Sequence, residues 1–456
     1  MPLQKNQVLT LRVERLSSDG SGVAHSPDGE TVFIPGAAPG DEARVRIVKD
    51  CKRYAFGILD EVLTPSPDRI PVDCAVAGPC GGCSLRHLDY AAELRAKQEN
   101  VADAFARIGG LDVPVLPIVG SPEVNRYRNK VQFPVGVDKS GKPCIGFYAG
   151  RTHRIVPCPD CRLQPGVLNE IGNALCAFFA EKGIQPYSEE TGRGLVRHIF
   201  LRRGAHSGQI MVCLVCTRAK LPSAEELCTR LKAQFAEITT ILLNVNAKNT
   251  NVILGTETHT LYGPGYIEDT LCGVPVQLGP LSFYQVNTLA AEQLYGIAAQ
   301  YAQLTPDDLL LDLYCGMGTI GLSMAAHCRE LIGVEIVPEA IESARANAAR
   351  MGADVAAKSR FFCADAGQAA TRLAAEGLHP DIVMLDPPRK GCDEATLSAV
   401  VRMSPRRVVY VSCNPATAAR DAAWLEQNGY CAEKVQPVDL FPRTRHCECV
   451  LSFSKV

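Results

Sequence analysis

From about residue 271 onward, the chain alternates short apolar runs with segments of helical periodicity. This alternation is typical of a parallel sheet with helices on its faces, so it predicts an α/β fold for the carboxyl-terminal part. In open sheets of this kind, ligands bind outside the carboxyl ends of the strands. The residues that end each apolar run are therefore the first candidates for function.

Four successive runs end in residues suited to a nucleotide-like ligand. The first, "DLLLDLYCGMGTIGL", is an apolar run, a glycine turn and a helix, which lets backbone approach a ligand at a helix N-terminus. The next three, "LIGVEI", "RFFCADA" and "DIVMLDPPRKG", end in Glu335, Asp365 and Asp386. An acid about 20 residues past the glycines can bind ribose hydroxyls. Singly, each could be an ordinary tight turn. In this order they resemble the Rossmann-like fold of S-adenosylmethionine-dependent methyltransferases.

The run "RRVVYVSCNPAT" follows one helix later and is the predicted fifth strand. It places Cys413 at the same sheet edge as Asp386. A thiolate there suits addition to C6 of a pyrimidine, which makes C5 nucleophilic toward a sulfonium methyl group. A base must then remove the C5 proton. Glu448, at the start of the last predicted strand, is the preferred base, with His446 as a neighbour on the same face; a solvated strand residue is the alternative for Glu448.

Two details favour carbon methylation of uracil. Arg389 follows the D-P-P turn, where methyltransferases of exocyclic amines commonly carry an aromatic residue, and "SCNP" differs from the T-C-S or P-C context of RNA cytosine-5 methyltransferases. Together, "SFYQVN", "LDLYCGMGTIGL", "LDPPRKG", "YVSCNPAT" and "FPRTRHCECV" resemble the RNA uracil-5 methyltransferase family. The resemblance implies Cys413 as the nucleophile and Glu448 as the base. It also implies S-adenosylmethionine as cofactor, bound by Gln285, Tyr314, Glu335, Asp365 and Asp386.

The rest of the chain divides into two predicted domains. Residues 1–63 alternate short strands with Gly, Pro and Asp turns, which predicts a five-stranded OB-like barrel. It resembles the TRAM domain of the same family, an RNA-binding unit. Residues 64–270 are predicted to form a strand-rich central α+β domain, whose helix over 90–110 can pack on the catalytic domain. Residues 271–456 would form the methyltransferase domain.

The central domain opens with a tight cysteine group, "CAVAGPCGGC", and a further pair lies in "IVPCPDC". Four thiolates can hold either a tetrahedral zinc ion or a [4Fe–4S] cluster, and the spacing alone leaves the metal open. Ribosomal-RNA members of the family carry an iron–sulfur cluster on such a pattern. The resemblance therefore implies a [4Fe–4S] cluster, with zinc as the alternative, on Cys74, Cys80, Cys83 and Cys161. Cys158 is an extra thiol that competes for the fourth position.

The net charge of −2 gives no nucleic-acid signal for the whole chain, so RNA binding is expected from local basic groups. In "RYRNKVQFPV", Arg126, Arg128 and Lys130 suit phosphate contacts and Tyr127 suits stacking on bases. A second basic group comprises Arg193, Arg197, Arg202 and Arg203.

No signal-peptide pattern and no apolar run of about 20 residues is present, so a cytoplasmic protein without membrane contact is predicted. The combined interpretation is a monomeric enzyme that methylates uracil C5 in RNA. Large-subunit (23S) ribosomal RNA is the preferred substrate, because the family's best-known bacterial transfer-RNA enzymes lack the barrel and the cysteine group. A transfer-RNA uracil-5 methyltransferase and a non-catalytic RNA-binding or assembly factor are the alternatives.

Overall fold

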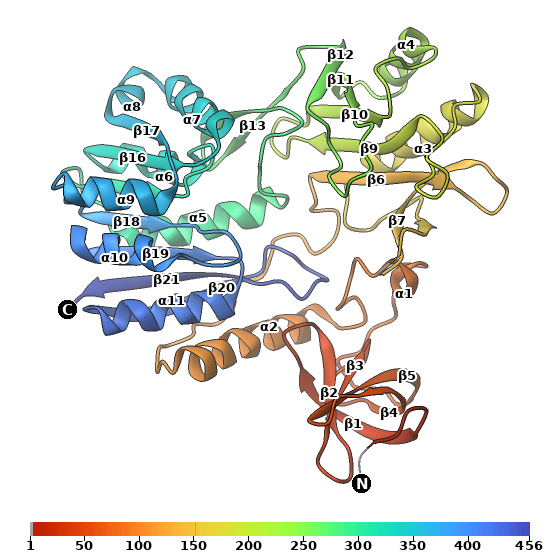
Figure 1. Cartoon of the computed structure of the whole chain (residues 1–456), viewed down its shortest axis with the longest axis horizontal. Coiled ribbons are helices and arrows are strands. Elements are labelled where there is room, and N and C mark those ends of the chain that lie inside the picture. Colours follow the sequence, from red (N-terminus) through yellow and green to blue (C-terminus); the bar gives the residue numbers. More distant parts are fainter. Residues whose placement is uncertain (1–2, 151) are drawn as a thin grey trace.

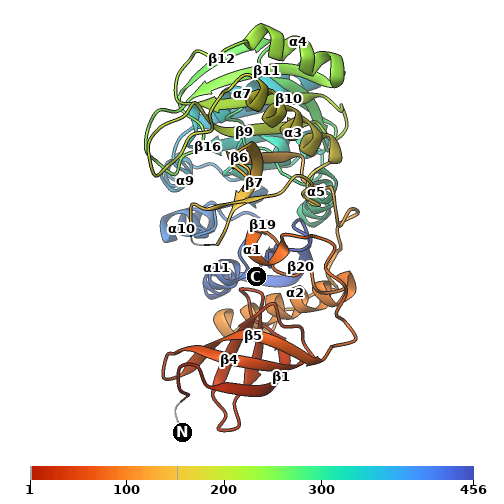
Figure 2. The same cartoon turned by 90° about the vertical axis from the view of Figure 1, so that its right-hand side faces the viewer.

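The computed structural model describes residues 3–150 and 152–456, so the first two residues of the predicted barrel domain lie outside the described part. A small barrel lies at one end of the molecule, and two larger sheets lie beyond it (Figures 1 and 2). Among the described residues, none of the helices combines the length and apolar character needed to span a bilayer.

The amino-terminal strands close into a barrel in the order β1-β2-β3-β5-β4. Their bounds are β1 (Val8–Leu16), β2 (Ser21–His25), β3 (Thr31–Pro35), β4 (Glu42–Asp50) and β5 (Tyr54–Thr64). Alternate residues such as Val32 and Ile34 are fully buried inside, which is the period-two pattern of a strand with one apolar face. The predicted five-stranded barrel is confirmed.

A seven-stranded sheet forms the central part, in the order β12-β11-β10-β9-β6-β7-β8. Its strands are β6 (Lys130–Val137), β7 (Pro143–Tyr148), β8 (Ile155–Pro157), β9 (Val196–Arg203), β10 (Ile210–Cys216), β11 (Ile238–Val245) and β12 (Glu257–Tyr262). Helices α3 (Gly166–Glu181) and α4 (Ala224–Gln234) bury their apolar sides against this sheet. Cys176, Cys213 and Cys216 are buried in these elements, as expected for small core residues.

The carboxyl-terminal sheet has the order β17-β16-β15-β18-β19-β21-β20. The five parallel strands are β15 (Leu309–Leu313), β16 (Glu330–Glu335), β17 (Ser359–Cys363), β18 (Ile382–Leu385) and β19 (Arg407–Ser412). The last strand, β21 (Glu448–Lys455), runs antiparallel between β19 and β20 (Tyr430–Val438). The predicted α/β fold is confirmed, and its strand order reverses between β15 and β18, where such sheets bind ligands.

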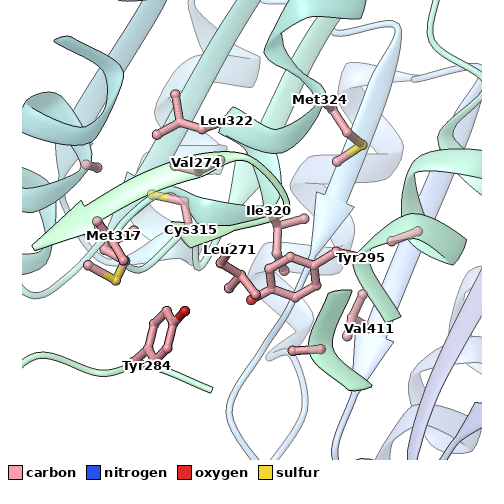
Figure 3. Packing of buried hydrophobic residues seen from close by; sticks show 14 of the residues in the cluster. Leu271, Val274, Tyr284, Tyr295, Cys315, Met317, Ile320, Leu322, Met324 and Val411 are labelled. Carbon is pink, nitrogen blue, oxygen red and sulfur yellow. The ribbon is translucent and has the colours of Figure 1, made fainter. Parts of the chain in front are cut away.

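Helices cover both faces of this sheet and bury two apolar cores. They are α5 (Thr288–Ala302), α6 (Thr319–Met324), α7 (Pro338–Met351), α8 (Ala353–Lys358), α9 (Ala366–Ala375), α10 (Glu394–Met403) and α11 (Pro415–Gln427). The hairpin β13 (Ile267–Leu271) and β14 (Val274–Leu278) packs into one core, and Figure 3 shows its Leu271 beside Tyr295 of α5 and Ile320 of α6.

In the sequence, two helices connect the barrel to the central sheet. They are the short helix α1 (Ala77–Cys80) and helix α2 (Tyr90–Ala104), which continues into a π-helical turn at Phe105–Gly109. Asp89 caps α2 by accepting a hydrogen bond from the Ala92 N–H. Phe105 is almost fully buried in a core of the carboxyl-terminal sheet. The helical segment at residues 90–109 therefore packs on the carboxyl-terminal sheet through Phe105.

Candidate active site

The glycine turn after β15 closes around the acid that ends β16. Gly316 and Gly318 have φ of 55° and 79°, which only glycine adopts without strain. The Gly316 N–H donates to Glu335 Oε2 at 3.2 Å, and Glu335 Oε1 accepts from the N–H groups of Ile336 and Val337 at 2.9 and 3.0 Å. The carboxylate is thus held half-buried beside the turn, where sequence analysis expected a ribose-binding acid.

Asp365 and Tyr314, which were also predicted to bind the methyl donor, lie beyond the carboxyl ends of the same sheet's strands. Asp365 caps α9 by accepting from the Gln368 N–H at 3.1 Å, and it lines an open groove of about 440 Å³ with Asp393. Tyr314 follows β15 with φ of 65°, and its hydroxyl lies 3.3 Å from Thr396 Oγ1. The structure therefore brings Tyr314, Glu335 and Asp365 to one edge of the sheet.

Two further carboxyl groups lie at this edge, Asp312 buried and Asp386 half-buried. Asp312 accepts from the Gly321 N–H at 3.0 Å through Oδ2, but its Oδ1 has no hydrogen-bond partner among residues 3–150 and 152–456. Burial raises the pKa of Asp312 to about 8 and that of Asp386 to about 7. Buried acceptors without a partner are costly, and a ligand that brings an ammonium group or hydroxyls would satisfy them. These groups fit the polar parts of S-adenosylmethionine.

Cys413 directly follows β19. The next residues of the chain hydrogen-bond to the loop that begins with Asp386-Pro387-Pro388. Asn414 caps α11 and donates from Nδ2 to the Arg389 carbonyl at 3.0 Å, while Thr417 Oγ1 donates to the same carbonyl at 3.3 Å. The pKa of the Cys413 thiol is raised to about 11, first by burial and then by the nearby Glu448 and Asp386 carboxyls, while Arg389 opposes the shift with its charge and a hydrogen bond. Arg389 is thus the cation placed to stabilise a Cys413 thiolate.

Glu448 begins β21 and is 6% exposed. Burial, reinforced by the Asp386 carboxyl, raises the pKa of Glu448 to about 8, and Arg389 opposes the shift. A pKa near the working pH is the property that a general base needs. His446 Nδ1 lies 3.4 Å from Arg389 Nη2, and burial together with Arg389 lowers the pKa of His446 to about 4. Cys413, Glu448 and His446 therefore lie around Arg389, and Asp386 lies close to Cys413 and Glu448. The sequence analysis did not single out this role of Arg389.

Gln285 lies in the loop between β14 and α5, which hydrogen-bonds to residues of the central part of the chain. Asn129 Nδ2 donates to the Gln285 carbonyl at 2.7 Å, and Arg202 donates to the carbonyls of Gly279 and Ser282, each at 2.7 Å. The same loop exposes Phe283, at 73%, two residues before Gln285. The sequence analysis missed Phe283; an aromatic residue inside a Pro/Ser-containing loop was the available signal.

The structure corrects the predicted RNA contacts of Tyr127, Arg197 and Arg202. Tyr127 is 5% exposed and donates its hydroxyl to the Pro442 carbonyl at 3.0 Å. Arg197 and Arg202 are 4% and 1% exposed. The prediction was wrong for the two arginines because a guanidinium has five N–H donors, which can all point to backbone carbonyls inside the protein instead of to RNA. Arg197 does so at Asn246 and Lys248.

The cysteine group forms a separate cavity of about 120 Å³. Its lining includes Cys74, Cys80, Cys83, Cys158 and Cys161, together with the cations Arg86, Arg128 and Arg162. No three His, Cys, Asp or Glu side chains in the described part of the chain are already arranged to hold a metal ion. Arg86 is nevertheless 4% exposed; its Nη1 donates to Asp73 at 2.6 Å, whereas its Nε and Nη2 find no hydrogen-bond acceptor within that part. Converging thiols beside a buried guanidinium with donors left over fit a negatively charged thiolate-bound metal group.

The fourth thiol is distinguished by its surroundings. A hydrogen bond from Cys158 and the backbone N–H groups of Leu163 and Gln164 lower the pKa of Cys161 to about 7, whereas the pKa of Cys158 is raised. Since the thiolate is the form that ligates metals, the backbone N–H groups of Leu163 and Gln164 at its sulfur favour Cys161 over Cys158 as a ligand.

Comparison with known proteins places these sites in a family. Residues 207–456 match the model of the tRNA (Uracil-5-)-methyltransferase family, and residues 2–59 match the TRAM domain. An uncharacterised RNA methyltransferase of Halalkalibacterium halodurans is 43% identical over 98% of this chain and 97% of its own length. One of Listeria monocytogenes is 42% identical, over 98% of each chain.

Among solved structures, the Pyrococcus abyssi tRNA (uracil-54, C5)-methyltransferase in complex with S-adenosyl-L-homocysteine superposes with a TM-score of 0.78. It is 26% identical, and the match covers 98% of this chain and 100% of that chain. The sheet-edge geometry, the family match and the full-length relatives agree. The chain therefore belongs to the RNA uracil-5 methyltransferase family and carries an amino-terminal TRAM domain.

Proposed function

We propose that the protein transfers a methyl group from S-adenosylmethionine to C5 of a uracil in RNA, through a covalent bond between Cys413 and C6. The observation that carries the proposal is that Cys413 and Glu448 both lie close to the Asp386 carboxyl and the Arg389 guanidinium. A thiol, a cation that stabilises its thiolate and a buried carboxyl of raised pKa are the groups that this chemistry requires.

In the proposed reaction, the Cys413 thiolate adds to C6 while Gln285 and Asp386 hold the polar edge of the uracil. S-adenosylmethionine, held by Tyr314, Glu335, Asp365, Gln285 and Asp386, supplies an electrophilic methyl group. Glu448 then takes the C5 proton, and the thiolate leaves. The target base must leave its stack to reach Cys413, at a cost of a few kcal/mol that RNA contacts elsewhere offset.

The proposed substrate is large-subunit (23S) ribosomal RNA, held by the barrel and the central part of the chain. Purified protein should form 5-methyluridine in a ribosomal-RNA transcript and not in transfer-RNA transcripts, as measured with labelled donor and nucleoside mass spectrometry. Methylation of transfer RNA alone would support the second candidate, since the Pyrococcus abyssi relative acts on tRNA. No 5-methyluridine in either RNA would favour a non-catalytic RNA-binding factor.

We propose that Cys74, Cys80, Cys83 and Cys161 hold a [4Fe–4S] cluster. Protein purified without oxygen should be brown, with broad absorbance near about 400 nm. Cys161→Ser should lose this colour because it removes a ligand. Cys158→Ser, the matched control one CxxC spacing away, should keep it. A colourless protein with stoichiometric zinc, or equal loss in both variants, would contradict the assignment.

We propose that Phe283 stacks on a base of the RNA next to the target. Base–aromatic stacking contributes about 1–3 kcal/mol per base, so Phe283→Ala should raise the KM for RNA by about 5- to 150-fold. The KM for the methyl donor should not change. Ile108→Ala serves as the control, because it removes a different exposed apolar side chain, one with 57% exposure. An unchanged KM for RNA would remove Phe283 from the interface.

A further inference from the structure

The loop at residues 439–447 joins β20 to β21 and ends immediately before Glu448. Val438 and Glu448 are paired across the two strands, and the Cys447 thiol donates to the Val438 carbonyl at 3.7 Å. His446 lies within the loop, beside Arg389. Because the loop leads directly into Glu448, its position determines where the Glu448 carboxyl points.

A buried ion network from α2 holds the start of this loop. Lys97 Nζ donates to Glu93 Oε1 at 2.7 Å, to Asp439 Oδ1 at 2.8 Å and to the Phe441 carbonyl at 3.2 Å. The side chains of Lys97, Glu93 and Asp439 are 1%, 0% and 0% exposed. Asp439 also accepts from the Tyr90 hydroxyl at 2.9 Å through Oδ2. Desolvated charges of this kind fix one geometry, because a displaced partner is left buried and unpaired.

The middle of the loop is held by the same segment. The Arg443 N–H donates to Glu93 Oε1 at 2.7 Å, and Arg443 Nη1 donates to the Leu88 carbonyl at 2.8 Å. The Leu85 N–H donates back to the Arg443 carbonyl at 3.1 Å. Arg443 has φ of 68°, an unfavourable conformation for a residue with a side chain, and these contacts compensate for it.

The backbone of Asp386 and Cys413 is held by the sheet, and the loop reaches their surroundings only through the contact of His446 with Arg389. Asp386 follows β18 and Cys413 follows β19, and both are fixed by the parallel sheet. Neither makes a described hydrogen bond to Lys97, Glu93 or Asp439. A displacement of the loop would therefore affect the carboxyl of Glu448 more than the thiol that starts the reaction.

We propose that Lys97, Glu93 and Asp439 are positioning residues for the proton-abstraction step, an inference that rests on the proposed function. In the methylated adduct, Glu448 accepts the C5 proton, the C5–H electron pair forms the C5–C6 double bond, and the C6–S bond breaks to return the thiolate to Cys413. The network holds the loop so that the Glu448 carboxylate meets that proton. Thiol addition and methyl transfer precede this step and need no contribution from the network.

Asp439→Asn tests the inference because it removes one charge and keeps the shape of the side chain. With unsubstituted RNA, turnover should fall about 10- to 100-fold, less than the roughly 10²- to 10⁴-fold expected when the general base itself is lost. Methyl transfer in a single turnover should change less than about 2-fold, and a denaturation-stable enzyme–RNA adduct carrying the methyl group should accumulate. Quenched single-turnover assays and denaturing gels with labelled donor measure both quantities.

Asp308→Asn is the matched control in the same sheet. Asp308 is 7% exposed by its side chain and pairs with Arg406 at 2.6 Å, at the amino end of β15. It should destabilise the protein without accumulating adduct. Tyr90→Phe deletes the hydrogen bond to Asp439 and the one accepted from the Ser121 N–H, but no charge. It should show the Asp439→Asn pattern at smaller amplitude, and it can be measured if Asp439→Asn folds poorly.

Equal slowing of methyl transfer and adduct release in Asp439→Asn and Tyr90→Phe, or adduct accumulation in Asp308→Asn as well, would overturn the inference. Failure of the proposed function is distinguishable, because the unaltered protein would then form no covalent complex with 5-fluorouracil-substituted RNA.

Discussion

Cys413→Ala is expected to abolish methylation and to form no covalent complex with 5-fluorouracil-substituted RNA, whereas the unaltered protein with methyl donor is trapped. The fluorine at C5 cannot leave as a proton, so the thiol added at C6 cannot be released. Loss of a nucleophile that acts as a unit with its neighbours lowers turnover by on the order of 10⁴-fold or more, about 5 kcal/mol of transition-state stabilisation. Denaturing gels detect the trapped complex, and labelled donor measures turnover.

The matched control is Cys431→Ala, an exposed cysteine on β20 of the same sheet. This variant should form the same covalent complex with 5-fluorouracil-substituted RNA as the unaltered protein. Trapping of both cysteine variants, or of none of the three proteins on competent RNA, would show that Cys413 is not the nucleophile.

Glu448→Gln is expected to stop the reaction after methyl transfer. The amide cannot accept the C5 proton, so turnover should fall by about 10²- to 10⁴-fold, the range for a lost general base. The methylated covalent adduct should accumulate on ordinary uracil-containing RNA, where the unaltered protein shows little. Denaturing gels with labelled donor separate this outcome from a block before methyl transfer, which would contradict the assignment.

The pH dependence of adduct release gives a second test of Glu448. Its pKa is raised to about 8, so the carboxylate that accepts the proton is the minor form at neutral pH. The release rate should therefore rise about tenfold per pH unit below pH 8 and level off above it. His446 cannot cause this profile, because its pKa is lowered to about 4 and it is neutral across the range. Glu448→Gln should flatten the profile, and an unchanged profile in that variant would implicate another group.

Much of the candidate site could be predicted from the sequence because it depends on strand ends. Glu335, Asp365, Asp386 and Cys413 each follow an apolar run, and parallel strands bring their carboxyl ends to one edge by the topology of the fold. The five-stranded barrel was predictable for a similar reason, since alternation and turn residues are local signals. The domain boundaries, the single-chain state and the cytoplasmic location stay predictions.

The exposure of charged and aromatic side chains could not be predicted in this way. Tyr127 lies in a basic segment and Arg202 in a basic strand, yet both side chains are buried. Each donates a hydrogen bond to a loop distant in the sequence, Tyr127 to Pro442 and Arg202 to Gly279. Phe283, in contrast, is an apolar residue that the fold leaves exposed. Local composition says which groups a segment carries, whereas long-range packing decides which of them meet water.

By itself, the sequence determined the family, the order of the strands and the residue types at their ends, because these follow from periodicity and turn chemistry within short windows. Only the tertiary structure showed Arg389 among Cys413, Glu448 and His446, and Lys97 of α2 bound to Asp439 ahead of Glu448. Lys97 and Asp439 are 342 positions apart in the sequence. Their pairing depends on burying both charges together, which no local pattern records.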